Sequence, residues 1–315
     1  MKNLKVLFSL FLVLLMALFV ACDKEQENNN NNDEKLEKIK VFLPNGAPLM
    51  SIGGLIGNEA FEFEFANGAD ALSAALIKED YDMIIAPLNL GAKLYLAGTS
   101  MYKLDSVITT NNTYLVSKNE ITSTADLAGL NVLAYGRNST PDIIFKAALT
   151  KNNVTCNVAY QGTVADVFGL FKGGSEEATY SLLAEPQVTM LKKSNPNLYV
   201  LDMAKEVEDG KVFPQACLFV KVSSSDKYDK HLELIKENIN SLNANPTDYA
   251  AKVEDKHTFF KTMTKEILAP ALPNCNIVYL KASSNKGVVE DYIGLLNTYA
   301  PALLGGKTVD EGFYN

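Results

Sequence analysis

The chain has 315 residues, of which 47% are hydrophobic and 21% are charged, so it is long enough for one large domain or two smaller ones with a packed core. Its net charge at neutral pH is −8, and it becomes −10 without residues 1–21, which hold two lysines and no acid. This acidic balance argues against nucleic acid as a partner and against electrostatic binding to a membrane surface.

The first 21 residues have the features of a secretory signal peptide. Lys2 and Lys5 precede an apolar run over residues 6–20, which is too short to span a membrane comfortably. The run leads to Cys22, and residues 18–22 (LFVAC) resemble a bacterial lipobox. That resemblance implies cleavage before Cys22, lipidation with acyl chains such as palmitate, and an extracytoplasmic protein anchored to the bacterial cell membrane. The alternative is an ordinary signal peptide followed by an incidental cysteine.

Residues 22–37 have the composition of a disordered tether. They include five consecutive asparagines at 28–32 among charged residues, and they show no apolar periodicity. Such a segment cannot bury enough surface to offset the entropy of ordering. The folded body is therefore expected to begin near residue 38.

Three cysteines, Cys156, Cys217 and Cys275, follow in the predicted body without metal-like spacing. We expect buried free thiols, and the alternative is one disulfide with one thiol left over. The sequence predicts no metal site and no cofactor.

From residue 38 the chain alternates short apolar runs with stretches of helical spacing, which predicts parallel sheets with helices on their faces. The first unit is expected to contain strand 39–43, helix 49–58, strand 61–65, helix 67–78, strand 82–86 and helix 90–97. The second unit repeats the pattern, with helix 123–127, strand 130–134, helix 143–149, strand 154–160, helix 164–172, strand 180–184 and helix 187–193. A further strand is expected at 214–220, and residues from 225 onward are expected to be mostly helical.

The strongest helix-start signal lies between strand 130–134 and helix 143–149. Ser139 or Thr140 can cap the helix, and Pro141 suits its first turn because its missing N–H would be unsatisfied there. Asp142, three residues after Ser139, resembles the acid of a capping box. A strand that leads into a helix this way presents free backbone N–H groups beyond the strand's carboxyl end, where open α/β sheets bind small ligands.

Polar or turn-forming residues follow the predicted strands at this same edge. We take as candidate ligand-binding residues Asn45, Gly46, Asn89, Asn111, Arg137, Asn138, Ser139, Thr140, Thr163, Glu185 and Gln215. Arg137 is the leading candidate, because a cation beside a helix N-terminus suits a carboxylate, sulfonate or phosphate.

Each candidate also has a purely structural interpretation. Arg137 can pair with a local acid such as Asp142, and Ser139 and Thr140 can serve only as caps. The asparagines Asn45, Asn89 and Asn111 also suit turns. Glu185 can bind a cationic or hydroxyl group or simply cap the next helix.

Seven segments in this order resemble the type II extracytoplasmic solute-binding proteins of ABC importers, in particular the group that includes nitrate-, sulfonate-, taurine- and thiamine-precursor-binding proteins. They are PNGAP at 44–48, ADAL at 69–72, DMIIAP at 82–87, TADLAG at 124–129, GRNSTPD at 136–142, EP at 185–186 and DEGFY at 310–314. The resemblance implies an α/β fold of two lobes, each a mostly parallel sheet flanked by helices. Lobe 1 would combine residues 38–119 and 214–315, lobe 2 would be residues 120–213, and strands at 114–117 and 214–220 would cross between them.

The resemblance also implies a function. A monomer would capture a small polar solute, anionic or heteroaromatic, between its lobes by hinge closure, and would deliver it to a permease and ATPase complex. A surface sensor that signals to a membrane partner is the alternative, because it needs the same cleft. An enzyme is not expected: the two histidines, His231 and His257, lie away from the strand ends, and no catalytic motif is present. A thiamine-precursor-type enzyme is the less favoured alternative.

Overall fold

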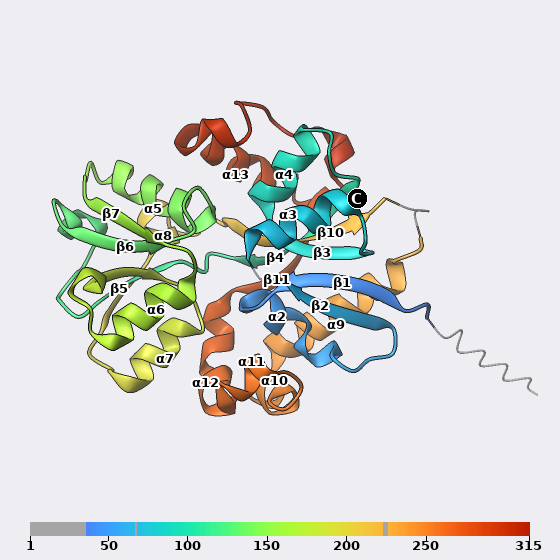
Figure 1. Ribbon diagram of the computed structural model, residues 1–315, viewed down its shortest axis with the longest axis horizontal. Coiled ribbons are helices and arrows are strands. Elements are labelled where there is room, and N and C mark those ends of the chain that lie inside the picture. The colour runs from blue at the N-terminus through green and yellow to red at the C-terminus, as the bar shows by residue number, and fades with distance from the viewer. Residues whose placement is uncertain (1–35, 67, 223–225) are drawn as a thin grey trace, which may run out of the picture. The chain divides into compact units, whose positions relative to one another are not determined.

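The computed structural model describes residues 36–66, 68–222 and 226–315 (Figure 1). The predicted signal peptide, the lipidation site at Cys22 and nearly all of the predicted tether lie outside the described residues. Among the described residues, no helix is long and apolar enough to cross a membrane.

Two sheets organise residues 37–315. The first has the strand order β11-β4-β10-β3-β1-β2, with β1 (Ile39–Pro44), β2 (Phe61–Ala66), β3 (Met83–Pro87), β4 (Tyr102–Thr110), β10 (Pro214–Lys221) and β11 (Ile277–Lys281). The second has the order β7-β6-β8-β5-β9, with β5 (Tyr114–Ser117), β6 (Asn131–Tyr135), β7 (Asn157–Gln161), β8 (Tyr180–Leu183) and β9 (Tyr199–Asp202). In each sheet the βα units pair in parallel, and β10, β11 and β5 pair antiparallel with their neighbours.

Helices cover both faces of both sheets, as the sequence pattern predicts (Figure 1). We call the first sheet and its helices the first lobe: α2 (Ala47–Ile52), α3 (Ala69–Lys78), α4 (Leu88–Leu96), α9 (Asp229–Ala244), α10 (Pro246–Val253), α11 (Thr258–Lys261), α12 (Thr264–Ala271) and α13 (Lys286–Tyr299). The second lobe is the second sheet with α5 (Thr140–Lys151), α6 (Val164–Gly173), α7 (Gln187–Ser194) and α8 (Met203–Val207). The predicted two-lobe α/β class is confirmed.

The core sits between sheets and helices. In β1 and β3 eight of the eleven residues are buried, which is typical of parallel strands covered by helices on both faces. Apolar side chains from both lobes, from Ile84 in β3 to Ile144 in α5 and Leu182 in β8, belong to one contiguous cluster. Cys217 and Cys275 are buried free thiols and Cys156 is a half-buried one, as expected.

Three strands were not predicted, namely β4, β9 and β11. The expectation that residues from 225 onward are mostly helical misses β11, which pairs with β4. Charged residues make β4 and β11 hard to recognise in the sequence. Asp105 interrupts the apolar run of β4, and Lys281 ends β11. The two side chains are joined by a salt bridge, so the sheet buries a charge that the pattern alone assigns to the surface.

The segment Tyr114–Ser117 also differs from expectation. We expected it to cross between the lobes as part of the first, but β5 pairs on one side with β8 and on the other with β9, inside the second sheet. The predicted crossing strand at 214–220 likewise lies inside one sheet, as β10 of the first. The chain instead passes to the second sheet at residues 111–113 and returns to the first at residues 208–213. We therefore propose that the first lobe ends near residue 110.

Removal of the Asp105 side chain is expected to destabilise the first sheet strongly. Its side chain is fully buried, and its carboxylate accepts hydrogen bonds from Tyr279 Oη at 2.9 Å and Asn315 Nδ2 at 3.0 Å, besides the Lys281 ion pair. Asp105→Ala leaves these donors without their acceptor, so we expect the free energy of unfolding to fall by about 3 kcal/mol. Urea denaturation measures this change. Asp209→Ala, at an exposed acid, is the control and should change stability by less than about 0.5 kcal/mol.

Candidate functional site: a cavity at the carboxyl ends of both sheets

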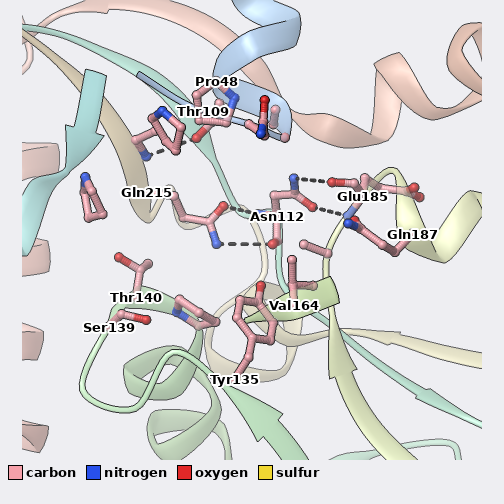
Figure 2. Close-up of a pocket in the computed structure, with 18 residues that line it drawn as sticks. Pro48, Thr109, Asn112, Tyr135, Ser139, Thr140, Val164, Glu185, Gln187 and Gln215 are labelled. Atoms are coloured by element: carbon pink, nitrogen blue, oxygen red, sulfur yellow. Dashed lines mark hydrogen bonds between the residues drawn. The ribbon is translucent and has the colours of Figure 1, made fainter. Parts of the chain in front are cut away.

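A cavity of about 250 Å³ lies where the carboxyl ends of β1, β3, β6 and β8 meet (Figure 2). This is the edge at which open α/β sheets bind ligands. Both lobes supply its walls, which are mostly apolar with a few neutral polar groups. The lining residues are Pro44, Asn45, Gly46, Ala47, Pro48, Pro87, Thr109, Asn112, Tyr135, Ser139, Thr140, Pro141, Val164, Ala184, Glu185, Gln187, Gln215 and Ala216.

Six of the predicted site residues line this cavity: Asn45, Gly46, Ser139, Thr140, Glu185 and Gln215. The other five, Asn89, Asn111, Arg137, Asn138 and Thr163, are not among the lining residues. Sequence reasoning did not select Asn112, Tyr135 or Gln187.

Asn112 joins the two lobes beside the cavity (Figure 2). Its side chain pairs with the backbone of Glu185 in the second lobe, because Glu185 N–H donates to Asn112 Oδ1 at 2.7 Å and Asn112 Nδ2 donates to the Glu185 carbonyl at 3.3 Å. Its own backbone N–H donates to Gln215 Oε1 of β10 at 3.0 Å, and Gln215 Nε2 donates back to the Asn112 carbonyl at 3.2 Å. Four hydrogen bonds thus fix the crossing point of the chain. The sequence shows only two asparagines between apolar runs, which is also the pattern of a turn.

Three helices of the second lobe begin at the cavity. Thr140 opens α5, Val164 opens α6 and Gln187 opens α7, and all three line the cavity wall. The first backbone N–H groups of a helix have no partner within the helix, and the helix dipole adds partial positive charge at that end. Glu185 is the one charged residue in the lining. The cavity therefore offers partial positive charge and neutral donors, which suits an anionic or electron-rich ligand atom.

The capping box predicted at the start of α5 does not form. Ser139 Oγ donates to the Gly136 carbonyl at 2.5 Å instead of capping a helical N–H. Asp142 is fully buried, and its carboxylate accepts from the N–H of Asn138 at 2.7 Å and from Tyr160 Oη at 2.6 Å. Asp142 therefore holds the turn before the helix in place, with Gly136 and Asn138 both in the left-handed region.

This turn directs Arg137 away from the lining. Arg137 is exposed, and its guanidinium carbon lies 4.7 Å from the centre of the Tyr160 ring, a cation–π contact within the second lobe. Its neighbour Asn138 accepts a hydrogen bond through its carbonyl from Asn89 Nδ2 of the first lobe at 3.3 Å. Both asparagines thus contact each other across the lobes rather than facing the cavity.

Asn111 and Thr163 have structural roles. Asn111 is in the left-handed region, and its side chain bonds the carbonyl of Lys211 at 2.8 Å and the N–H of Phe213 at 2.7 Å, which ties the two crossing segments together. Thr163 caps α6 and forms a capping box with Asp166.

Glu185 reaches the cavity wall, but its carboxylate is engaged elsewhere. Both oxygens accept from Thr189 in α7, one from its N–H at 2.9 Å and one from its hydroxyl at 3.0 Å. In Figure 2 the side chain extends away from Gln215 and Tyr135. Burial raises the pKa of this carboxyl, against the effect of the two hydrogen bonds from Thr189. These contacts agree with the interpretation that Glu185 caps the start of α7.

Tyr135 presents the clearest free polar group. It ends β6, and its hydroxyl points toward the middle of the lining residues (Figure 2). Burial raises its pKa, so the hydroxyl keeps its proton at neutral pH. Within the described part of the chain this hydroxyl has no hydrogen-bond partner. A largely apolar wall with a few unpaired polar groups is typical of a small-molecule site.

No group of three or more histidine, cysteine, aspartate or glutamate side chains in residues 36–66, 68–222 and 226–315 is arranged to hold a metal ion.

Comparison with solved structures identifies the fold. The chain is similar to an ABC transporter structure from Parabacteroides distasonis, with a TM-score of 0.75, 21% identity, and coverage of 88% of this chain and 98% of that one. It is also similar to the periplasmic aliphatic sulphonate binding protein from Escherichia coli, with a TM-score of 0.68, 13% identity, and coverage of 87% and 90%. A Candida albicans protein with the generic periplasmic binding protein fold gives a TM-score of 0.56 at 11% identity, with coverage of 88% and 94%. These likenesses show that the chain has the two-lobe periplasmic-binding-protein fold.

No family model matches the sequence, and no curated protein matches it.

The buried Glu185 carboxyl predicts a pH-dependent effect of its substitution. Because folding raises its pKa, Glu185 favours the folded state less and less as pH rises from the ordinary carboxyl range to its raised folded value. Glu185→Gln removes this titration and keeps an acceptor for Thr189. We expect the variant to gain stability relative to wild type as pH rises from about 4 to about 7.

Thermal melting across that pH range measures the difference between the two proteins. A difference that is constant with pH, or that shrinks as pH rises, would contradict the burial of an ionisable carboxyl at this position.

Proposed function

We propose that this protein is the solute-binding component of an ABC importer. It would hold one small solute in the cavity between its lobes and present the closed complex to a permease and its ATPase. The position of the cavity carries this proposal, since residues from both lobes line it at the carboxyl ends of both sheets. A solute in contact with both lobes favours their closed arrangement over any open one, which is the coupling that an importer needs. The fold shared with an ABC transporter structure and a sulphonate-binding protein supports the proposal.

The lining favours a compact solute with an apolar body and one electron-rich end. Four prolines, Pro44, Pro48, Pro87 and Pro141, and three alanines make up much of the wall. The electron-rich end would face the N-termini of α5, α6 and α7, where the helix dipoles favour a sulfonate or carboxylate without a cationic side chain. A heteroaromatic ring with acceptor nitrogens meets the same requirement.

A binding role fits the side chains better than a catalytic one. The lining contains neither histidine nor cysteine, and its carboxyl group caps α7. His231 Nε2 donates to the Glu37 carbonyl, 2.8 Å away, and His257 caps α11, so both histidines are occupied elsewhere. We therefore propose binding, and not catalysis, as the role of this lining.

We further propose an extracytoplasmic location with a lipid anchor at Cys22 and residues 23–37 as a tether. This rests on the lipobox-like residues 18–22 and the asparagine run at 28–32.

A panel of alkanesulfonates, small carboxylates and pyrimidines tests the proposal by thermal shift. A compound that binds only the folded state at a hundredfold excess over its dissociation constant stabilises the protein by about 2.7 kcal/mol. We expect one of these classes to raise the melting temperature. A protein that responds to none of them would count against a solute-binding role.

Two variants locate the binding site for the compound that stabilises most. Tyr135→Phe removes a free hydroxyl donor of the lining and should weaken affinity roughly five- to tenfold in calorimetric titration. Arg137→Ala changes a side chain outside the lining and should have a much smaller effect. The reverse ranking would place the solute at the Arg137 loop rather than in the cavity.

Lipidation is tested separately in a bacterial host. Cys22→Ser should move the protein from the membrane fraction to the soluble extracytoplasmic fraction, because the acylated sulfur is lost. Retention of the variant in the membrane fraction would refute the anchor.

A further inference from the structure

The first turn of α5 belongs to the second lobe but is bonded to the first. Residues 139–141 of this turn line the cavity. Thr140 Oγ1 lies 2.6 Å from the hydroxyl of Tyr292, which comes from α13 of the first lobe. Thr140 is 2% exposed and Tyr292 is 1% exposed, so water does not compete for this bond. Just before the turn, the Asn138 carbonyl accepts from Asn89, again from the first lobe.

Both hydroxyls of this bond are buried, and either of them can donate to the other. Burial raises the pKa of Tyr292, so its hydroxyl keeps its proton at neutral pH. Within the described residues, Thr140 Oγ1 is the one hydrogen-bond partner of this hydroxyl. A buried hydroxyl without a partner costs free energy, so each of the two residues stabilises the position of the other.

We propose that Tyr292 is a positioning residue for the solute site. Through its hydrogen bond with Thr140, it fixes the position of residues 139–141 relative to the part of the cavity wall that comes from the first lobe. Tyr292 is not among the residues that line the cavity. This inference rests on the proposed function, because it assumes that a solute occupies the cavity.

A residue that only positions the cavity wall can be recognised by how its substitution changes the affinities for different solutes. Since Tyr292 touches no solute, loss of its hydroxyl weakens every solute by a similar factor, whatever polar groups each one carries. A residue that contacts the solute, as proposed for Tyr135, instead changes affinity according to solute chemistry. A merely structural role of Tyr292 would lower the melting temperature and leave affinity unchanged.

The experiment compares Tyr292→Phe, Thr140→Val and the double variant with wild type. Tyr292→Phe keeps the buried ring and removes only the hydroxyl. Tyr299→Phe is the matched control, since it removes a half-buried hydroxyl from the same helix, away from the cavity. Calorimetric titration with ethanesulfonate, butanesulfonate and benzoate gives the affinities.

We expect Tyr292→Phe to weaken every probe that wild type binds roughly five- to tenfold, and Tyr299→Phe to bind like wild type. The double variant should be no weaker than Thr140→Val alone, because the two residues act as one unit. Wild-type affinity for Tyr292→Phe, or effects that multiply in the double variant, would overturn the inference while leaving the proposed function intact.

If wild type binds none of the probes, it is the proposed solute class that fails. The bond itself is then tested without ligand, by urea unfolding of the same four proteins. A coupling between Thr140→Val and Tyr292→Phe supports the tie between α5 and α13. Strictly additive losses of stability overturn it.

Discussion

The cavity depends on the hydrogen bonds that converge on Asn112. The chain crosses from the first sheet to the second at this point, and the Asn112 side chain pairs with the backbone of Glu185, at the end of a second-lobe strand. Gln215 of the central strand β10 closes the network from the first lobe. Both partners also line the cavity, so the residues that set the relation between the lobes are the residues that a solute would meet. A solute that contacts Glu185 or Gln215 would therefore contact residues that hydrogen-bond the two lobes at Asn112.

The chemistry of the cavity follows from where its helices begin. Parallel strands end at one edge, and the helix after each strand begins there with the partial positive charge of its dipole. The second lobe brings α5, α6 and α7 to the cavity in this way. We propose that these helix N-termini supply the partial positive charge at the site, since Arg137 lies against Tyr160. A lining of helix N-termini, prolines and neutral polar side chains would select for shape and for acceptor atoms more than for net charge.

Much of the fold can be read from the sequence, because the βα alternation of both lobes is local and strongly patterned. The missed elements have two different causes. In β4 and β11 the burial depends on partners far away in the chain, because the Asp105 charge in β4 is neutralised by Lys281, 176 residues later. The strand β9 has only four residues, and none of them is buried. The site shows the same division. Ser139, Thr140 and Glu185 follow from strand-end positions and Gln215 from its place near the hinge. Asn112 is indistinguishable from a turn residue until its partners are known. Arg137 lies outside the lining, and the direction of its side chain depends on two left-handed residues beside it, Gly136 and Asn138.

The most direct test of the account is a crystal structure of the protein grown with the small molecule that stabilises it most. The account predicts one solute in the cavity, in contact with Tyr135 and Gln215 and with its electron-rich end toward the first turns of α5, α6 and α7. A solute bound elsewhere, or a cavity that holds only water while the solute occupies another surface, would contradict it.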